Sequence, residues 1–215
     1  MFHLIVFDLD GTLIDSRRDL ANATNALLVE CGAEPLAEER IGRMVGDGAA
    51  TLVARAFDAS GVTRPPDALE RFLAMYSAHL LDHTQPYPDV PEVLDQLANR
   101  VNLAVLTNKP LEATRRILDG LSLARYFAPD AVIGGDGPFP RKPDPAGLCH
   151  LMARSGARPG HTLMVGDSSI DVRTARAAAA PVCLVRYGFG FDALPSGDLR
   201  TDDHVIDNLR QLLSL

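Results

Sequence analysis

Five short apolar segments, separated by longer segments of helical character, constrain the fold of this chain more than any other feature. The apolar runs cover residues 3–7, 101–106, 131–133, 162–165 and 181–185. Runs that are apolar throughout are typical of strands buried on both faces, as in a parallel sheet covered by helices. From the second run onward, helix-forming segments such as 92–100, 111–121 and 173–180 lie between the runs. This alternation predicts an α/β fold with a doubly wound parallel sheet.

One long interval, between residues 8 and 100, contains no convincing strand. Apolar residues recur there at helical spacing, in residues 20–31 and again in residues 69–80. We therefore expect residues 16–84 to form an inserted helical domain, and residues 1–15 and 85–215 to form the α/β core. Because the insert begins directly after an acidic turn, it is placed to act as a lid over that turn.

The composition limits the classes of partner. The formal net charge is −7 and no cluster of Lys and Arg is present, which predicts that the protein does not bind nucleic acid. No apolar run is long enough for a membrane span or a signal peptide, so we expect no membrane association. The three cysteines form no C-x-x-C pair and are expected to be reduced thiols. These features predict a cytoplasmic protein, either a monomer or a homodimer.

Polar side chains follow three of the five predicted strands. They are Asp8 and Asp10 after the first strand, Thr107, Asn108 and Lys109 after the second, and Asp167 and Asp171 after the fourth. Lys142 lies ahead of a predicted helix in the segment RKPDP. Since ligands of open α/β sheets bind at the carboxyl ends of the strands, we expect these side chains to form one site.

The charge of these residues indicates what the site binds. Four carboxylates beside one lysine would repel one another strongly unless a cation lay among them. Magnesium accepts one or two carboxylates together with phosphate oxygens and water, which matches this set of side chains. The sequence therefore predicts a Mg²⁺ site that also takes a phosphate group.

Four short motifs, taken in order, resemble those of the haloacid dehalogenase superfamily phosphatases. They are DLDGT at 8–12, LTNK at 106–109, RKPDP at 141–145 and GDSSID at 166–171. A single short acidic motif would be weak evidence, but four motifs in order at domain-scale spacing are strong evidence. The resemblance covers nearly the whole chain, and it implies a Rossmann-like three-layer core with an inserted helical cap.

The resemblance also implies roles for individual residues. Asp8 would be the nucleophile that attacks phosphorus and forms an aspartyl-phosphate. Asp10 would protonate the leaving oxygen and then deprotonate the water that cleaves the intermediate. Thr107 would hydrogen-bond the phosphoryl group together with the backbone of Asn108. Lys142 would neutralise charge on Asp8 and on the phosphate oxygens.

The same resemblance implies the metal ligands. Mg²⁺ would lie between the Asp8 carboxylate, the backbone carbonyl of Asp10, Asp167 and Asp171. Asp171 also stands at a predicted helix start, where an acidic residue is favoured by the helix dipole without any metal. For Asn108 and Lys109, a plain turn role is an alternative to a role in the site.

Within the superfamily, several stretches are similar to those of phosphoglycolate phosphatases. They are residues 106–110, 134–145, 185–190 and 202–212. Phosphatases of sugar phosphates and pyrophosphate share them in part. The expected function is therefore Mg²⁺-dependent hydrolysis of a small phosphorylated metabolite, with phosphoglycolate as the favoured substrate. In one departure from the family, residues 175–182 lack the glycine expected before the last strand.

Other functions are possible on related folds. A response-regulator receiver also joins Asp, Thr and Lys with magnesium, but it is smaller and has no helical insert. A halide-releasing dehalogenase needs no second acid at the position of Asp10. A phosphosugar mutase would share the core, but its lid would need cationic and hydroxyl groups to hold the sugar. A pyrophosphatase on the same fold is a further alternative.

Overall fold

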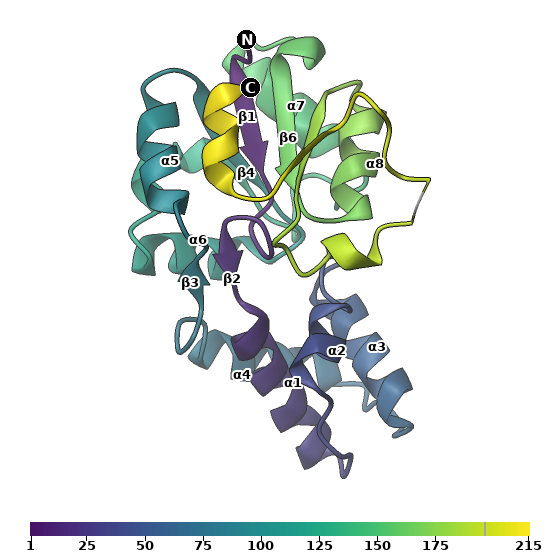
Figure 1. The fold of residues 1–215 in the computed structure, drawn as a ribbon. Helices are drawn as coiled ribbons and strands as arrows, with labels where there is room; N and C mark the ends of the chain where they lie inside the picture. The colour runs from purple at the N-terminus through teal and green to yellow at the C-terminus, as the bar shows by residue number, and fades with distance from the viewer. Residues whose placement is uncertain (196) are drawn as a thin grey trace.

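Six parallel strands form the sheet at the centre of the molecule (Figure 1). The computed structural model describes residues 1–195 and 197–215. In their order across the sheet, the strands are β5 (Val132–Ile133), β4 (Asn102–Leu106), β1 (Leu4–Phe7), β6 (Thr162–Gly166), β7 (Val182–Val185) and β8 (His204–Ile206). The five predicted strands are all present, and the predicted α/β class is confirmed. The sixth, β8, was not predicted, because it is a short edge strand in which only Ile206 is buried.

Helices cover both faces of the sheet. One face carries α5 (Val90–Ala98), α6 (Leu111–Gly120) and the 3-10 turns of η5 (Leu209–Ser214), and the other carries α7 (Ala146–Ser155) and α8 (Ser169–Ala177). Strand β1 contributes to both cores because its side chains alternate in direction. Ile5 and Phe7 pack with α5 and α6, whereas Leu4 and Val6 pack with α7 and α8. This is the three-layer arrangement that the apolar runs predicted.

Four further helices lie between β1 and β4 in the sequence. They are α1 (Arg17–Glu30), α2 (Glu38–Gly42), α3 (Ala49–Ser60) and α4 (Ala68–Ala78). Their apolar faces pack on one another around the buried residues Leu27, Phe57 and Phe72, and α1 contacts the other three. In Figure 1 they form a separate group below the sheet. A two-stranded antiparallel ribbon of β2 (Ile14–Asp15) and β3 (Gln85–Pro86) flanks the group.

The order of the strands brings the predicted site residues together. Strand β1 lies between β4 and β6, and the three are followed directly by Asp8, Thr107 and Asp167. Parallel strands end at the same edge of a sheet, and in Figure 1 the three strands end at the edge nearest the four inserted helices. The residues that follow them therefore lie side by side at that edge. No helix in residues 1–195 or 197–215 has the length and apolar character needed to cross a bilayer.

At the end of α8, an alanine takes the position where the sequence analysis expected a glycine before the last strand. Ala179 adopts a left-handed conformation with φ 55°, its N–H donates to the Arg176 carbonyl, and the N–H of Ala180 donates to the Ala175 carbonyl. This pair of hydrogen bonds is the Schellman arrangement, in which the left-handed residue is usually glycine. Alanine keeps the same chain path, at a cost of about 1 kcal/mol for its β-carbon.

We expect Ala179→Gly to raise the free energy of unfolding by roughly 0.5–1 kcal/mol, because it relieves this strain at an exposed position. The matched control is Ala177→Gly, an exposed alanine in the last turn of α8, which should lower it by about the same amount. Urea unfolding of the three proteins measures both effects. Equal losses in both variants would show that Ala179 is not strained.

Candidate active site

The turn after β1 places Asp8 and Asp10 at the edge of the sheet. Asp8 is buried, and Gly11 follows with φ +84°, a conformation that favours glycine. A β-carbon at Gly11 would lie 2.2 Å from Oδ2 of Asp167. Gly11 therefore allows the turn to adopt its left-handed conformation and to approach the end of β6 closely.

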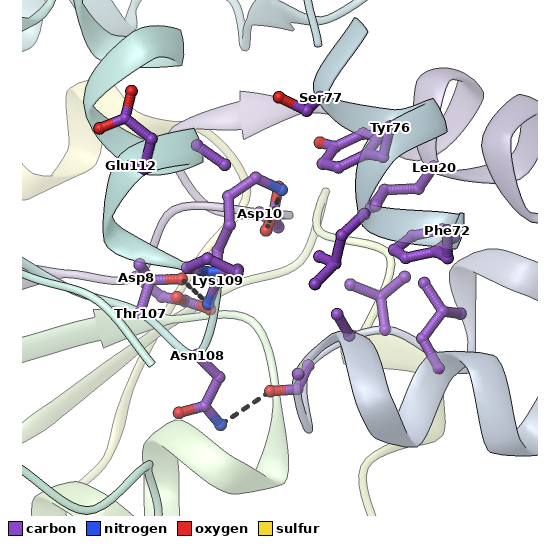
Figure 2. A pocket seen from close by; sticks show the side chains of 18 residues that line it. Asp8, Asp10, Leu20, Phe72, Tyr76, Ser77, Thr107, Asn108, Lys109 and Glu112 are labelled. Carbon is purple, nitrogen blue, oxygen red and sulfur yellow. Dashed lines mark hydrogen bonds and ion pairs between the residues drawn. The ribbon is translucent and has the colours of Figure 1, made fainter. Parts of the chain in front are cut away.

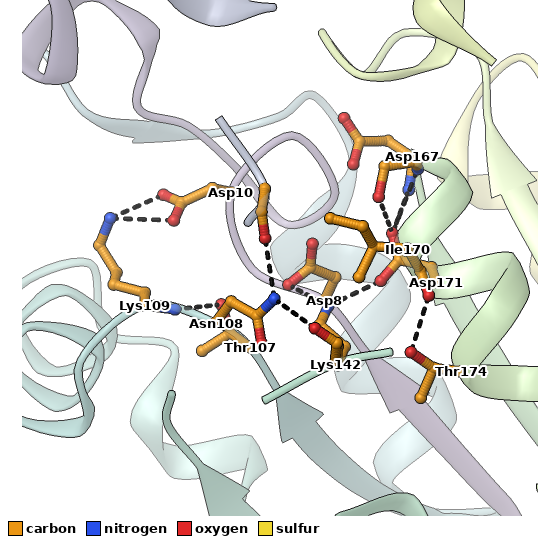
Figure 3. A network of polar contacts seen from close by, with 12 residues as sticks. Asp8, Asp10, Thr107, Asn108, Lys109, Lys142, Asp167, Ile170, Asp171 and Thr174 are labelled. Atoms are coloured by element: carbon orange, nitrogen blue, oxygen red, sulfur yellow. Dashed lines mark hydrogen bonds and ion pairs between the residues drawn. The ribbon is translucent and has the colours of Figure 1, made fainter. Parts of the chain in front are cut away.

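Lys142 joins two of the acids (Figure 3). Its Nζ lies 2.8 Å from Oδ1 of Asp8 and 2.6 Å from Oδ1 of Asp171, and all three side chains are buried. Burial alone would lower the pKa of Lys142, but the negative charges of Asp171 and Asp8 outweigh it and raise the pKa above its usual value. The lysine therefore stays protonated, which supports the predicted role of neutralising charge beside Asp8.

Three carboxylates gather at this point. Asp8, Asp167 and Asp171 are buried, and each offers an oxygen that lies within 4.8 Å of the others. Burial raises the pKa of Asp8 to about 6, against the opposing charge of Lys142. Burial and the charges of Asp171 and Asp8 also raise the pKa of Asp167 well above its usual range. One lysine therefore does not balance the three acids, and the set of oxygen donors fits a divalent cation.

Asp171 has a second role in this cluster. Its Oδ2 accepts hydrogen bonds from the Ser168 hydroxyl at 2.8 Å, the Ser168 N–H at 3.1 Å and the Asp167 N–H at 3.2 Å. Ser168 and Asp171 thus form a capping box at the start of α8. With Oδ1 on Lys142, both oxygens of Asp171 are engaged. Its geometry explains how it holds Lys142 and the Asp167 turn, while its predicted contact with the metal stays a prediction.

The loop after β4 supplies Thr107 and Asn108. Both are buried, and both line the same cavity as Asp8. The Asn108 amide donates to the Gly46 carbonyl at 2.9 Å and to the Lys142 carbonyl at 3.0 Å. Its side chain therefore ties the inserted segment to the loop that carries Lys142. The predicted phosphate contact of Asn108, through its backbone N–H, stays a prediction.

Asp10 has a partner, Lys109, that the sequence placed among the strand-end residues without a specific role. Nζ of Lys109 lies 2.9 Å from both carboxylate oxygens of Asp10, and the Ser16 hydroxyl donates to Oδ1 at 2.5 Å. Lys109 is only 6% exposed and lies over the ring of Tyr76 from α4, 4.6 Å from its centroid. The side chain of Asp10 therefore points to Lys109, whereas its predicted metal ligand is the backbone carbonyl.

The scarcity of lysine in the sequence is a further signal for Lys109. The chain has 21 Lys and Arg residues, of which only Lys109 and Lys142 are lysines. Both are buried, and each pairs with one aspartate of the DLD motif, Lys142 with Asp8 and Lys109 with Asp10. In a chain that uses arginine for its other basic positions, two isolated lysines indicate sites where a compact ammonium is needed.

A cavity of about 280 Å³ opens in front of Asp8 and Asp10, between the sheet edge and the inserted helices (Figure 2). Its core side is polar and includes Thr107, Asn108 and Lys109. Its other wall is mainly apolar and comes from the inserted segment; the apolar residues are Leu20, Val45, Ala49, Leu52, Phe72 and Leu73. The predicted catalytic acids therefore lie at one side of a small cavity whose opposite wall is largely apolar.

Comparison with known proteins gives a consistent result. Residues 5–185 match the haloacid dehalogenase-like hydrolase family. The phosphoglycolate phosphatase of Rhodospirillum rubrum is 44% identical over 89% of this chain and 83% of its own length. Phosphoglycolate phosphatase 1 of Pseudomonas aeruginosa is 39% identical over 98% of this chain and 78% of its own length. The crystal structure of a predicted phosphoglycolate phosphatase from Haemophilus somnus superimposes with a TM-score of 0.90 at 30% identity, covering 99% of this chain and 97% of that one.

The raised pKa of Asp8 makes a prediction about stability. An acid whose pKa rises from 3.8 to about 6 on folding stabilises the fold below pH 4, and this contribution is lost as the pH rises through 6. In metal-free buffer at pH 7.5, Asp8→Asn should therefore raise the free energy of unfolding by about 1–3 kcal/mol. The gain should shrink toward pH 4.

Urea unfolding in the presence of a chelator, at pH 4 and at pH 7.5, measures this difference. The matched control is Asp58→Asn, which changes an exposed aspartate on α3 and should alter the free energy of unfolding by less than about 0.5 kcal/mol at either pH. A gain for Asp8→Asn that did not depend on pH would contradict the assigned cause.

Proposed function

The chain belongs to the haloacid dehalogenase-like hydrolases, and on that premise we propose that it is a Mg²⁺-dependent phosphatase of a small phosphate monoester, with 2-phosphoglycolate as the favoured substrate. Its activity as a phosphatase follows from the family and the named relatives. The observation that carries the finer proposal is the buried Asp8, which Lys142 holds at the end of β1 beside Asp167. The names of the relatives support the choice of substrate.

Asp8 is the proposed nucleophile. Lys142 holds Oδ1 of Asp8 at 2.8 Å, and the other carboxylate oxygen attacks phosphorus in line with the leaving group. The P–O bond to the leaving group breaks as the bond to Asp8 forms, which gives an aspartyl-phosphate. The Thr107 hydroxyl and the Asn108 backbone N–H bind the phosphoryl oxygens, and Lys142 offsets their charge.

Asp10 is the proposed general acid and base. It gives a proton to the departing oxygen of the ester in the first step. In the second step it takes a proton from the water that attacks the aspartyl-phosphate, so that Asp10 returns to its starting state and inorganic phosphate is released. The Ser16 hydroxyl and Lys109 hold the Asp10 carboxylate in place for both transfers.

The metal would be held by Asp8, the backbone carbonyl of Asp10, Asp167 and Asp171. When bound, Mg²⁺ supplies positive charge that reduces the repulsion between the phosphate and Asp8. The three buried carboxylates with one lysine support this assignment, since they leave uncompensated negative charge without a cation.

Residues 16–84 are the proposed cap, and residues 1–15 and 85–215 the catalytic core. The ribbon of β2 and β3 stands where the chain passes between the two. The cap closes the cavity over Asp8 and Asp10, and a volume of about 280 Å³ suits a small metabolite. Excluding water from this space protects the aspartyl-phosphate until Asp10 activates the hydrolytic water.

Phosphate release from a panel of small phosphates tests the proposal. With Mg²⁺, the wild type should release phosphate from 2-phosphoglycolate faster than from sugar phosphates or pyrophosphate. A chelator, or Asp8→Asn, should reduce release to background, since one removes the cation and the other the nucleophile. Asp58→Asn, the same change at an exposed site, should behave as wild type. Release that survived Asp8→Asn would exclude Asp8 as the nucleophile.

Asp10→Asn should separate the two steps. With p-nitrophenyl phosphate, whose leaving group needs no proton, the variant should form the aspartyl-phosphate and then hydrolyse it about 10²- to 10⁴-fold more slowly than wild type. Mass spectrometry of acid-quenched protein should then show one added phosphoryl group on the peptide that contains Asp8. Steady-state turnover equal to that of wild type would refute the proposed second role of Asp10.

A further inference from the structure

The apolar wall of the cavity restricts what can bind beside the phosphate. Leu20 and Phe72 from the inserted helices face Asp8 and Asp10 across the cavity (Figure 2), and Leu52 also lines it. A sugar phosphate would place several hydroxyl groups against this wall, where they would lose their hydrogen bonds to water without replacement. The leaving group that suits the cavity is therefore compact and has few polar atoms.

Lys109 is the single cation among the residues that line the cavity, as far as the described chain shows. It is 6% exposed, lies against the ring of Tyr76, and forms an ion pair with Asp10. The other lysine, Lys142, lies beyond the nucleophile and pairs with Asp8 and Asp171. One positive charge is thus placed on the leaving-group side of the site and one on the phosphoryl side.

The position of Lys109 matches a second negative charge on the substrate. In the proposed mechanism the leaving oxygen lies beside Asp10, and Nζ of Lys109 is 2.9 Å from both oxygens of Asp10. In 2-phosphoglycolate a single methylene separates the ester oxygen from the carboxylate, so the carboxylate comes within reach of the same ammonium. Without Lys109, that carboxylate would meet the negative charges of Asp10 and Glu112, which also line the cavity.

A lysine suits this task better than an arginine. An ammonium carries three donors that rotate about one bond, so it can keep one hydrogen bond to Asp10 while another N–H turns toward a ligand. A guanidinium would pair with both oxygens of Asp10 as a planar fork and would hold them. The Tyr76 ring keeps the ammonium over the cavity by a cation–π contact.

We propose that Lys109, supported by Tyr76 of the inserted segment, selects phosphate esters that carry a carboxylate next to the ester carbon. This inference rests on the proposed function and adds to it the residue that discriminates among substrates. In the free protein Lys109 contacts Asp10, and in the complex it contacts both Asp10 and the substrate carboxylate.

The test compares two substrates of the same size that differ in one charge, 2-phosphoglycolate and its amide, 2-phosphoglycolamide. Wild type should hydrolyse the acid with a kcat/KM about ten- to hundredfold above that of the amide, as expected for one buried charged contact. Lys109→Met, which keeps the length of the chain without the charge, should bring the ratio to about one or below. Circular dichroism and urea unfolding check that the variant is folded.

Arg116→Met is the matched control. It removes one positive charge from the same interface, where Arg116 contacts Ser77 of α4, but Arg116 does not line the cavity. Its ratio of acid to amide should equal that of wild type. A ratio that fell as far in Arg116→Met as in Lys109→Met would assign the preference to the general field of the interface and overturn the proposal.

The remaining outcomes separate this inference from the proposed function. Equal losses on both substrates in Lys109→Met would mean that the lysine acts only by holding Asp10, and would overturn the selective role. The ratio of kcat/KM between acid and amide can also be measured on the wild type alone. A ratio near one, with ready phosphate release, would overturn the selective role of Lys109 and leave the phosphatase proposal intact. No release from either substrate would count against the proposed substrate itself, and the inference would fall with it.

Discussion

The burial of negative charge at the end of β1 is the constraint on which the rest of this structure depends. Asp8, Asp167 and Asp171 lie together in a protein interior, where each isolated charge would be very unfavourable. Lys142 compensates part of that charge, and the capping box of α8 binds one oxygen of Asp171. The negative charge that remains uncompensated is what the proposed cation would balance when an anionic substrate binds. The cost to stability and the capacity for chemistry have the same physical origin.

Much of the arrangement could be predicted from the sequence because parallel strands impose their own geometry. Residues that follow β1, β4 and β6 must meet, since the strands are buried neighbours that end at one edge. The clustering of Asp8 with Asp167 therefore followed from two short motifs. The edge strand β8 did not follow, because its three residues lack the continuous apolar pattern of a central strand.

Side-chain pairing was less predictable than side-chain position. Lys109, three residues beyond the end of β4, looks the same in the sequence whether its ammonium is in water or over Tyr76. Only packing against α4 decides between the two. Asn108 is similar, because its partner Gly46 is distant in the sequence and belongs to the inserted segment. The inserted helices therefore complete the site with contacts that no local pattern encodes. Ala179 shows the reverse case, in which the backbone keeps a glycine-like turn without glycine.

The distribution of lysine has a further consequence for the chemistry of the whole molecule. Both lysines of the sequence, Lys109 and Lys142, are buried in the site. The positively charged side chains on the surface are therefore guanidinium groups, which amine-directed reagents modify far less readily than ammonium groups. Lys109 is 6% exposed and packs against Tyr76 of α4, so we expect its acylation to need a local movement of that helix. The rate at which a small acylating reagent modifies Lys109 should then report how often α4 moves away from it, without any engineered probe.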